Sequence, residues 1–315
     1  MAAKRIDYWI KLFGSLYSRS DRGRKPEEYW IATMAHCSGI GESIRRVDYP
    51  ELIKSAAHAF CWICCFNNHL RNNKKDLLFY IDHSLCDIVF FKFPNICGHC
   101  FRNPCQCDPY KTDQKKDKAA NYKRLLKEWT INRKVEGHTI EEWLSIFRAI
   151  YGGQNHLLTL ESIGFHFLEE GGEEALAIRQ LMQLRGKIER WSKEDKLFLN
   201  RICKIEGLVD EYDKCARDDN GKPRIDMKSG SIQAIKNRII KAKMDLVIEL
   251  ADTFSWFCAI QIKMLRILET IEIKKPEDYD LEEFLKKEYK LGKGKLSCPT
   301  CKEGPCKCRF YPKTS

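Results

Sequence analysis

Apolar side chains recur at every third or fourth position over long stretches of the chain, the spacing of a helix with one buried face. Residues 233–271 contain neither Gly nor Pro and keep this spacing throughout. Two shorter stretches, residues 9–17 and 143–151, each carry Trp, Phe and Tyr at helical spacing. These patterns predict an all-α protein. Only residues 77–93, with runs of aromatic and β-branched side chains, favour a short β-hairpin.

Three sequence blocks of the first half recur in the same order in the second half. They are residues 9–17, 57–62 and 97–107, which align with residues 143–151, 251–256 and 298–308. The second copy carries an insertion at about residues 181–240, between its first two blocks. Matched order and identical spacing of rare residue types predict a tandem duplication.

The duplication divides the chain into units of different character. They are a first helical half (residues 1–94), a first cysteine cluster (95–110), a charged linker (111–135), a second helical half (136–275), and a C-terminal helix with a second cysteine cluster (276–315). The linker is rich in Lys, Asp and Gln, which predicts a solvated helix or coil. Its lysines also allow contact with nucleic acid.

Composition narrows the class of protein. The 315-residue chain is 43% hydrophobic and 31% charged, as expected of a globular protein with a substantial core. The formal net charge of +11 suits a polyanionic partner such as a nucleotide or nucleic acid, although solubility alone would also account for it. The N-terminus lacks the apolar core of a signal peptide, and the most apolar run, residues 246–268, carries four charged side chains. We therefore expect a cytoplasmic protein without a membrane partner.

Two pairs of acidic residues have the same spacing. Glu170 and Glu173 lie three positions apart in one predicted helix, and Glu249 and Asp252 do so in another. This spacing puts both acids of a pair on one helix face. Two such helices side by side would bring four carboxylates together, which requires a cation, and an all-oxygen site favours Mg²⁺ or Mn²⁺. The alternative is a solvated acidic surface.

The sequence around these acids resembles the MazG-type all-α nucleotide pyrophosphohydrolases. The matching segments are Thr159-Leu160-Glu161-Ser162-Ile163, Leu168-Glu169-Glu170-Gly171-Gly172-Glu173 and Glu249-Leu250-Ala251-Asp252, which follow the family pattern ExxE and then ExxD on a second helix. The resemblance implies that Glu170, Glu173, Glu249 and Asp252 bind Mg²⁺, which holds the triphosphate of a nucleotide. A water then attacks to release a nucleoside monophosphate and pyrophosphate. Glu169 is the candidate that orients or deprotonates this water.

The chain departs from the family in two ways. The gap between ExxE and ExxD is usually short, whereas here the insertion separates the two motifs. In the first half the equivalent positions are His36, Gly39, Ser55 and His58, which cannot bind Mg²⁺ as four carboxylates do. A different metal site at the two histidines is the alternative to ordinary packing. Because the family often builds its bundle across a dimer interface, we hypothesise an intrachain pseudo-dimer with a catalytically inactive first half. Pairing with a second copy stays open.

Two clusters of four cysteines have identical spacing. They are Cys97, Cys100, Cys105 and Cys107, and then Cys298, Cys301, Cys306 and Cys308. Four thiolates so close together favour a closed tetrahedral site for a structural Zn²⁺, with disulfides and an iron–sulfur cluster as alternatives. The other cysteines have mostly apolar neighbours and are predicted to be buried. They are Cys37, Cys61, Cys64, Cys65, Cys86, Cys203, Cys215 and Cys258.

The leading hypothesis is a Mg²⁺-dependent nucleoside triphosphate pyrophosphohydrolase with one active half, one degenerate half and two zinc knuckles. A second hypothesis is a non-enzymatic protein that binds a nucleotide or nucleic acid. A third is an adaptor whose zinc knuckles dock a partner protein. Trp62 and its repeat counterpart Trp256 are predicted to be core residues rather than base-stacking ones.

Overall fold

The computed structural model of the protein describes residues 3–19, 21, 23–76, 78–98, 100–107, 137–192, 232–271, 276–289 and 297–308. Over these ranges the chain forms eight α-helices and one 3-10 helix, and no β-strand. The prediction of an all-α protein is confirmed. None of the described helices is long and apolar enough to cross a membrane.

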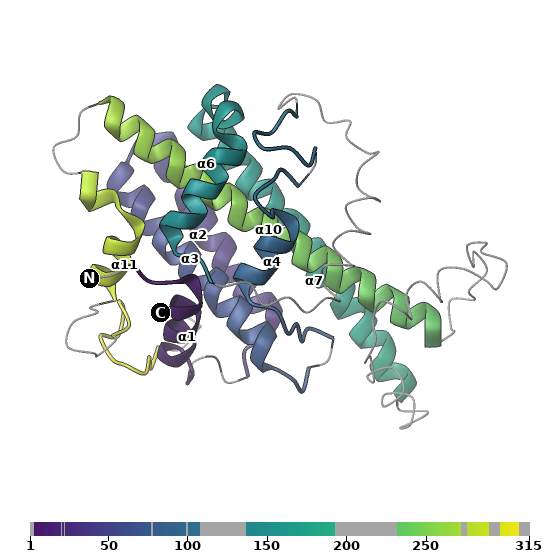
Figure 1. Cartoon of the computed structure of the whole chain (residues 1–315). Coiled ribbons are helices and arrows are strands. Elements are labelled where there is room, and N and C mark those ends of the chain that lie inside the picture. Colours follow the sequence, from purple (N-terminus) through teal and green to yellow (C-terminus); the bar gives the residue numbers. More distant parts are fainter. Residues whose placement is uncertain are drawn as a thin grey trace.

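The helices follow one another along the chain as shown in Figure 1. Their bounds are α1 Ile6–Leu16, α2 Pro26–Arg46, α3 Tyr49–Asn72, α4 Leu85–Lys92, α6 Ile140–Leu157, α7 Leu160–Ser192, α10 Ile232–Thr270, the 3-10 helix η1 Pro276–Tyr279, and α11 Leu281–Glu288.

Four long helices form the centre of the protein. α2 packs against α3, α7 packs against α10, and contacts between α2 and α7 join the two pairs (Figure 1). The sequence of residues 233–271 predicted either one long helix or two in succession, and the structure shows one uninterrupted helix of 39 residues, α10. Gly171 lies so close to α2 that a Cβ on it would be 2.5 Å from Sδ of Met34. The indole N–H of Trp30 in α2 donates to the carbonyl oxygen of Gly171 at 2.8 Å. The missing side chain of Gly171 therefore permits the close approach of α2 and α7.

The aromatic stripes predicted in residues 9–17 and 143–151 anchor α1 and α6 to this centre. α1 packs against α3, and α6 packs against α10. Trp9 stacks on Phe13 with ring centroids 5.8 Å apart, and Trp143 stacks on Phe147 at 5.7 Å. All four side chains are fully buried. Burial of each such ring contributes about 2 kcal/mol, so the stripes are a main source of the stability of these contacts.

The starts of α1 and α6 meet each other. Arg5 and Thr139 form an isolated antiparallel bridge, and the amide of Ile6 donates to the carbonyl oxygen of His138 at 2.9 Å. Thr139 also caps α6, because its hydroxyl accepts from the amide of Glu142 at 3.1 Å while the Glu142 carboxylate accepts from the amide of Thr139 at 2.6 Å. One short segment thus begins α6 and ties it to α1.

The β-hairpin predicted in residues 77–93 is wrong, because residues 85–92 form helix α4. The Ser84 hydroxyl accepts from the amide of Asp87 at 3.1 Å, and the Asp87 carboxylate accepts from the amide of Ser84 at 2.9 Å. This capping box starts the helix, and α4 then packs against α10. Strand preference reflects the packing environment more than the backbone. The conformation of this apolar run is therefore determined by its helix cap and its tertiary contacts.

The short helices α4 and α11 both precede a cysteine cluster and both have eight residues. α4 packs against α10, whereas α11 packs against α3. Each therefore lies against the long helix of the other half of the sequence. The short helix predicted after Pro276 is confirmed, with Pro276 itself at the start of the preceding 3-10 helix.

Some predicted features lie outside the described residues. They are the charged linker at residues 111–135, Cys203 and Cys215, and the central part of the insertion at about residues 181–240. The described part of the insertion is helical, because α7 extends to Ser192 and α10 begins at Ile232.

Candidate metal centres

Each cysteine cluster gathers its four sulfur atoms at one point. In each cluster the four Sγ atoms all lie within 4.8 Å of one another. The Sγ atoms of Cys97 and Cys107 are 3.8 Å apart, and those of Cys298 and Cys308 are also 3.8 Å apart. Four ligands about 2.3 Å from a tetrahedral zinc ion are about 3.8 Å from one another. The residues present therefore fit a four-sulfur metal site, as the spacing predicted.

The two clusters repeat the same backbone detail. Phe101 and Lys302 hold equivalent positions and both adopt a positive φ, of 55° and 60°. The amide of Cys97 donates to the carbonyl oxygen of Arg102 at 3.0 Å, and the amide of Cys298 donates to that of Glu303 at 2.9 Å. Backbone amides also donate to sulfur in both copies, which stabilises thiolate charge. They are the amides of Gln106 to Cys100, Cys107 to Cys105, Lys307 to Cys301 and Cys308 to Cys306.

Each cluster docks on the opposite half of the sequence. The amide of Cys105 donates to the carbonyl oxygen of Ile150 in α6, and the amide of Cys306 donates to that of Leu16 in α1, both at 2.7 Å. Figure 1 shows the first cluster beside α6 and the second beside α1. The Tyr151 hydroxyl adds a contact of 3.5 Å to Sγ of Cys97. The clusters therefore hold the two halves of the sequence together.

The remaining described cysteines are buried free thiols, so the prediction of apolar packing is confirmed for them. They are Cys37, Cys61, Cys64, Cys65, Cys86 and Cys258. Burial raises the pKa of the thiols of Cys37, Cys64, Cys65, Cys86 and Cys258, to about 12 for Cys86. Neutral thiols with such values do not act as metal ligands or nucleophiles.

A carboxylate cluster joins α7 and α10. Oxygens of Glu170, Glu249 and Asp252 all lie within 4.8 Å of one another. Glu170 comes from α7, and the other two lie one turn apart on α10. The sequence argument brought these three residues together correctly. Six oxygens around a magnesium ion at about 2.1 Å are separated by about 3 to 4 Å, so the grouping fits an all-oxygen cation site.

The other two predicted acids occupy exposed positions. Glu173 lies one turn beyond Glu170, and its charge helps to raise the pKa of Glu170 and of Glu249, so it stands near the cluster without joining it. Glu169 is exposed and pairs with Nδ1 of His166 at 3.1 Å. The described structure thus separates the predicted set into three converging carboxylates and two at the surface.

A lysine that the sequence argument missed completes the cluster. Lys92, the last residue of α4, forms an ion pair with Asp252, and only 8% of its side chain and 14% of that of Asp252 are exposed. No motif links α4 to the acids, since the pairing depends on α4 packing against α10. A cation therefore already sits against the carboxylates.

Burial controls the protonation of the cluster. Desolvation, together with the charge of Asp252, raises the pKa of Glu170 to about 9 and that of Glu249 to about 8, and the Lys92 ammonium opposes both shifts. Carboxyl groups with these values hold their protons at pH 7 in the absence of metal. The cluster is then close to neutral, with one ion pair and two protonated carboxyl groups.

Trp256 packs against the hydrophobic core, as predicted, and also borders the cluster. Its indole N–H donates to Oε1 of Glu170 at 3.1 Å, and its ring stacks on His166 with centroids 4.6 Å apart. The side chain is only partly buried, as is that of Trp62. The N–H bond orients the Glu170 carboxyl group, a role that the prediction of a core tryptophan did not include.

Glu174 is an acid near the cluster that the sequence argument did not include in the site. It is 2% exposed, and its nearest donor is the hydroxyl of Thr253 at 3.4 Å. Desolvation raises its pKa to about 8. Helical spacing was the available signal, because position i+4 from Glu170 lies on the same face of α7.

The equivalent positions of the first half form a histidine pair. His36 and His58 stack with ring centroids 5.1 Å apart. Burial, and then the neighbouring His58, lower the pKa of His36 to about 4. A Cβ on Gly39 would lie 2.8 Å from the Ser55 hydroxyl, so the residue without a side chain lets α2 and α3 approach here. The prediction of ordinary packing agrees with this arrangement.

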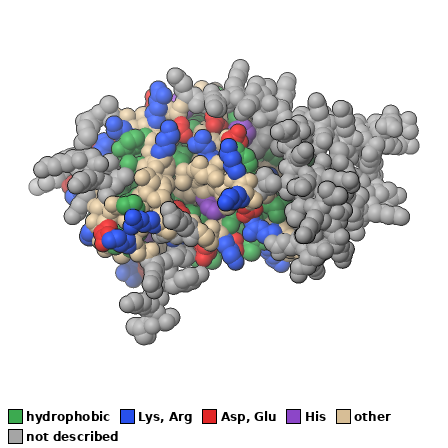
Figure 2. Space-filling model, turned by 90° about the horizontal axis from the view of Figure 1, so that it is seen from below, with side chains coloured by type: hydrophobic (Ala, Val, Ile, Leu, Met, Phe, Trp, Pro, Cys, Tyr) green, Lys and Arg blue, Asp and Glu red, His purple; other side chains and the backbone are tan. Residues whose placement is uncertain are grey.

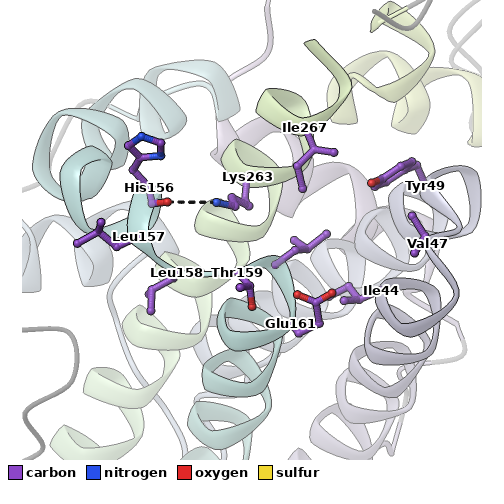
Figure 3. Close-up of a pocket in the computed structure, with 11 residues that line it drawn as sticks. Ile44, Val47, Tyr49, His156, Leu157, Leu158, Thr159, Glu161, Lys263 and Ile267 are labelled. Carbon is purple, nitrogen blue, oxygen red and sulfur yellow. Dashed lines mark hydrogen bonds between the residues drawn. The ribbon is translucent and has the colours of Figure 1, made fainter. Parts of the chain in front are cut away.

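Two cavities lie away from the carboxylates. One, of about 360 Å³, is lined by apolar side chains such as Ile44 and Leu157 and by Lys263, whose Nζ donates to the carbonyl oxygen of His156 at 3.5 Å (Figure 3). The other, of about 520 Å³, is polar and includes Arg24 and Arg185. Neither is lined by Glu170, Glu249 or Asp252. At the carboxylates themselves, the Lys92 ammonium lies against Asp252.

On the face shown in Figure 2, the described residues form no continuous basic stripe. Lys and Arg side chains lie there at separate places with Asp and Glu between them. A continuous basic stripe is the usual footprint of a nucleic-acid-binding protein. Comparison of the chain with protein-family models, with curated proteins and with solved structures gave no match.

Proposed function

We propose that the protein is a Mg²⁺- or Mn²⁺-dependent nucleoside triphosphate pyrophosphohydrolase that resembles the MazG-type enzymes. The observation that carries the proposal is the convergence of Glu170, Glu249 and Asp252 within 4.8 Å, with the Lys92 ammonium against Asp252. Converging buried carboxyl groups are costly unless they hold protons or bind a cation, and a divalent metal would stabilise all three in their charged form. The alternative of a solvated acidic surface does not account for three partly buried acids and a buried lysine.

In this proposal Glu170, Glu249 and Asp252 hold the divalent metal, and Glu173 is the fourth ligand at the exposed edge. When bound, the metal would neutralise the triphosphate and lower the pKa of an attacking water. Trp256 keeps the Glu170 carboxyl group in place through its N–H donor. Glu169, which is exposed one position before Glu170, remains the candidate for orienting the water.

We also propose that the chain is a tandem pseudo-dimer with an inactive first half. The contact between Arg5 and Thr139 supports this, since the two residues hold equivalent positions in the two halves. The reciprocal docking of the clusters on Ile150 and Leu16 supports it too, because those acceptors are also equivalent. Interactions exchanged in both directions are what an isologous interface produces. The histidine pair then occupies the place of the metal site in the inactive half.

The test is pyrophosphate release from a panel of ribo- and deoxyribonucleoside triphosphates with Mg²⁺. We expect release from at least one nucleotide by the wild-type protein and a loss of about a hundredfold or more in Glu249→Gln. Glu269→Gln is the matched control, because Glu269 is an exposed acid on the same helix. Release that is unchanged in Glu249→Gln, or absent with every nucleotide, would refute the proposal. In the second case, salt-dependent retention on single-stranded nucleic acid would favour the binding hypothesis.

A further inference from the structure

Lys92 lies against a carboxylate, Asp252, that a bound metal ion would also contact. Its ammonium contacts Oδ2 of Asp252, and its charge also acts on Glu170 and Glu249. A divalent ion bound to the same three carboxylates would stand beside this ammonium in a site shielded from water. Like charges repel strongly in such surroundings. The ammonium and a metal ion therefore compete for Asp252.

The reach of Lys92 is fixed by the first cysteine cluster. A Cβ on Gly98 would lie 3.4 Å from Cγ of Lys92 and 3.0 Å from the ring of Phe93, so the loop of the cluster packs directly on the lysine stem. The amide of Gly98 also donates to the Tyr151 hydroxyl at 3.4 Å. The stem is thus held between the first cluster and the helix that carries Asp252.

The second half of the sequence offers a natural comparison. α11 has the same length as α4 and packs against α3, yet its last residue is Glu288 where α4 ends in Lys92. On α3 the position equivalent to Asp252 is His58. The last position of this short helix is therefore a lysine only where the facing long helix carries the acids, although α11 has Lys286 and Lys287 just before its end. The charge of Lys92 is matched to the carboxylate cluster and is no general need of the fold.

We propose that Lys92 is an internal counter-ion that a divalent metal must displace from Asp252. This inference rests on the proposed function, since it assumes that the carboxylate cluster binds metal. The need to displace Lys92 lowers metal affinity by the strength of the ion pair, and while no metal is bound the ion pair neutralises Asp252. Metal binding and release of Lys92 from Asp252 then occur together. The released ammonium, which belongs to the first half of the sequence, then lies beside the metal-bound site.

The first experiment measures Mn²⁺ binding to the full-length protein without nucleotide, from the electron paramagnetic resonance signal of free Mn²⁺. We expect Lys92→Met to bind Mn²⁺ about tenfold more tightly than wild type, since coupling within close charge pairs is of this size or larger. Lys92→Arg, which keeps the charge, should stay near wild type. Lys286→Met is the matched control, because Lys286 is a similarly covered lysine of α11 that pairs with Glu282.

The second experiment uses the unaltered chain and so does not depend on folding of a variant. Acylation of Lys92 by a succinimidyl ester, followed by mass spectrometry, should increase several-fold when Mn²⁺ is added, while acylation of Lys286 stays constant. Equal Mn²⁺ affinity in Lys92→Met and wild type, or weaker binding by a folded Lys92→Met, would overturn the counter-ion role and leave the metal site intact. Constant acylation of Lys92 at saturating Mn²⁺ would do the same. Absence of Mn²⁺ binding in every variant would instead remove the proposed function.

Discussion

Glu174 predicts an unusual dependence of stability on pH. Its carboxyl group is 2% exposed, its only described donor is a hydroxyl at 3.4 Å, and burial raises its pKa to about 8 from an ordinary value near 4.5. Between these two values the unfolded chain carries an ionised carboxylate, whereas the folded chain keeps the proton. The folded state then binds more protons, so the free energy of unfolding falls as pH rises through this window.

The size of the effect follows from the shift. One pKa unit corresponds to about 1.4 kcal/mol, so this group alone removes about 3 kcal/mol of stability between pH 5 and pH 7. The loss ends above pH 8, where both states are ionised. Glu174→Gln imitates the protonated group and should abolish this contribution. We expect the variant to match wild type near pH 5 and to exceed its stability by about 2 to 3 kcal/mol at pH 7.

Urea unfolding monitored by circular dichroism, without added divalent metal, measures this difference at several pH values. Glu161→Gln is the control, because Glu161 is an exposed acid on the same helix. Other groups titrate in the same range, so the decisive quantity is the difference between Glu174→Gln and wild type at each pH. A difference that stays constant from pH 5 to pH 7, or a variant less stable than wild type at pH 7, would refute the reasoning.

Four further predictions concern other parts of the molecule. Because burial lowers the pKa of His36 to about 4, protonation of the unfolded chain should lower the free energy of unfolding as pH falls from 6.5 to 4. His36→Gln should recover about 1 to 2 kcal/mol of this free energy in urea unfolding, whereas the control His156→Gln, at an exposed histidine, should not. Phe254→Ala should lower the free energy of unfolding by about 3 to 5 kcal/mol, since the ring is 1% exposed. Elemental analysis should find two zinc ions per chain and one in Cys301→Ser, whereas iron would contradict the four-sulfur zinc sites. Trp256→Phe keeps the ring on His166 but loses the donor to Glu170, so the pyrophosphate-release rate should fall about tenfold, while an unchanged rate would show that the indole N–H is not needed.

Periodic patterns carried most of the helix predictions. The stretch that forms α10 was predicted to be helical, as one long helix or two in succession, because neither Gly nor Pro interrupts it. α4 was not predicted, because its run of Ile, Val and Phe fits a buried strand as well as a helix. The deciding contacts are a short-range cap at Ser84 and a long-range contact with α10. Only the first of these is visible in the sequence.

The candidate site divides in a similar way. Helical spacing was sufficient to group Glu249 with Asp252, and the alignment of motifs brought Glu170 to them. Spacing could not separate Glu173 from Glu170, because the orientation of α7 against α10 decides which acid faces inward. The contact of Lys92 with the site could not be predicted, because Lys92 is distant in sequence from every acid near it.

The sequence by itself determined the helical class, the two four-cysteine sites and the pairing of acids on two helices. Each follows from local periodicity or from rare residues at short spacing, and none of the three needs knowledge of the packing. Only the tertiary structure decided that each cysteine cluster docks on the opposite half, and that Lys92 rests against Asp252. Those contacts depend on the relative placement of helices that are distant in sequence. This placement is determined by the packing of the whole core, and no single segment specifies it.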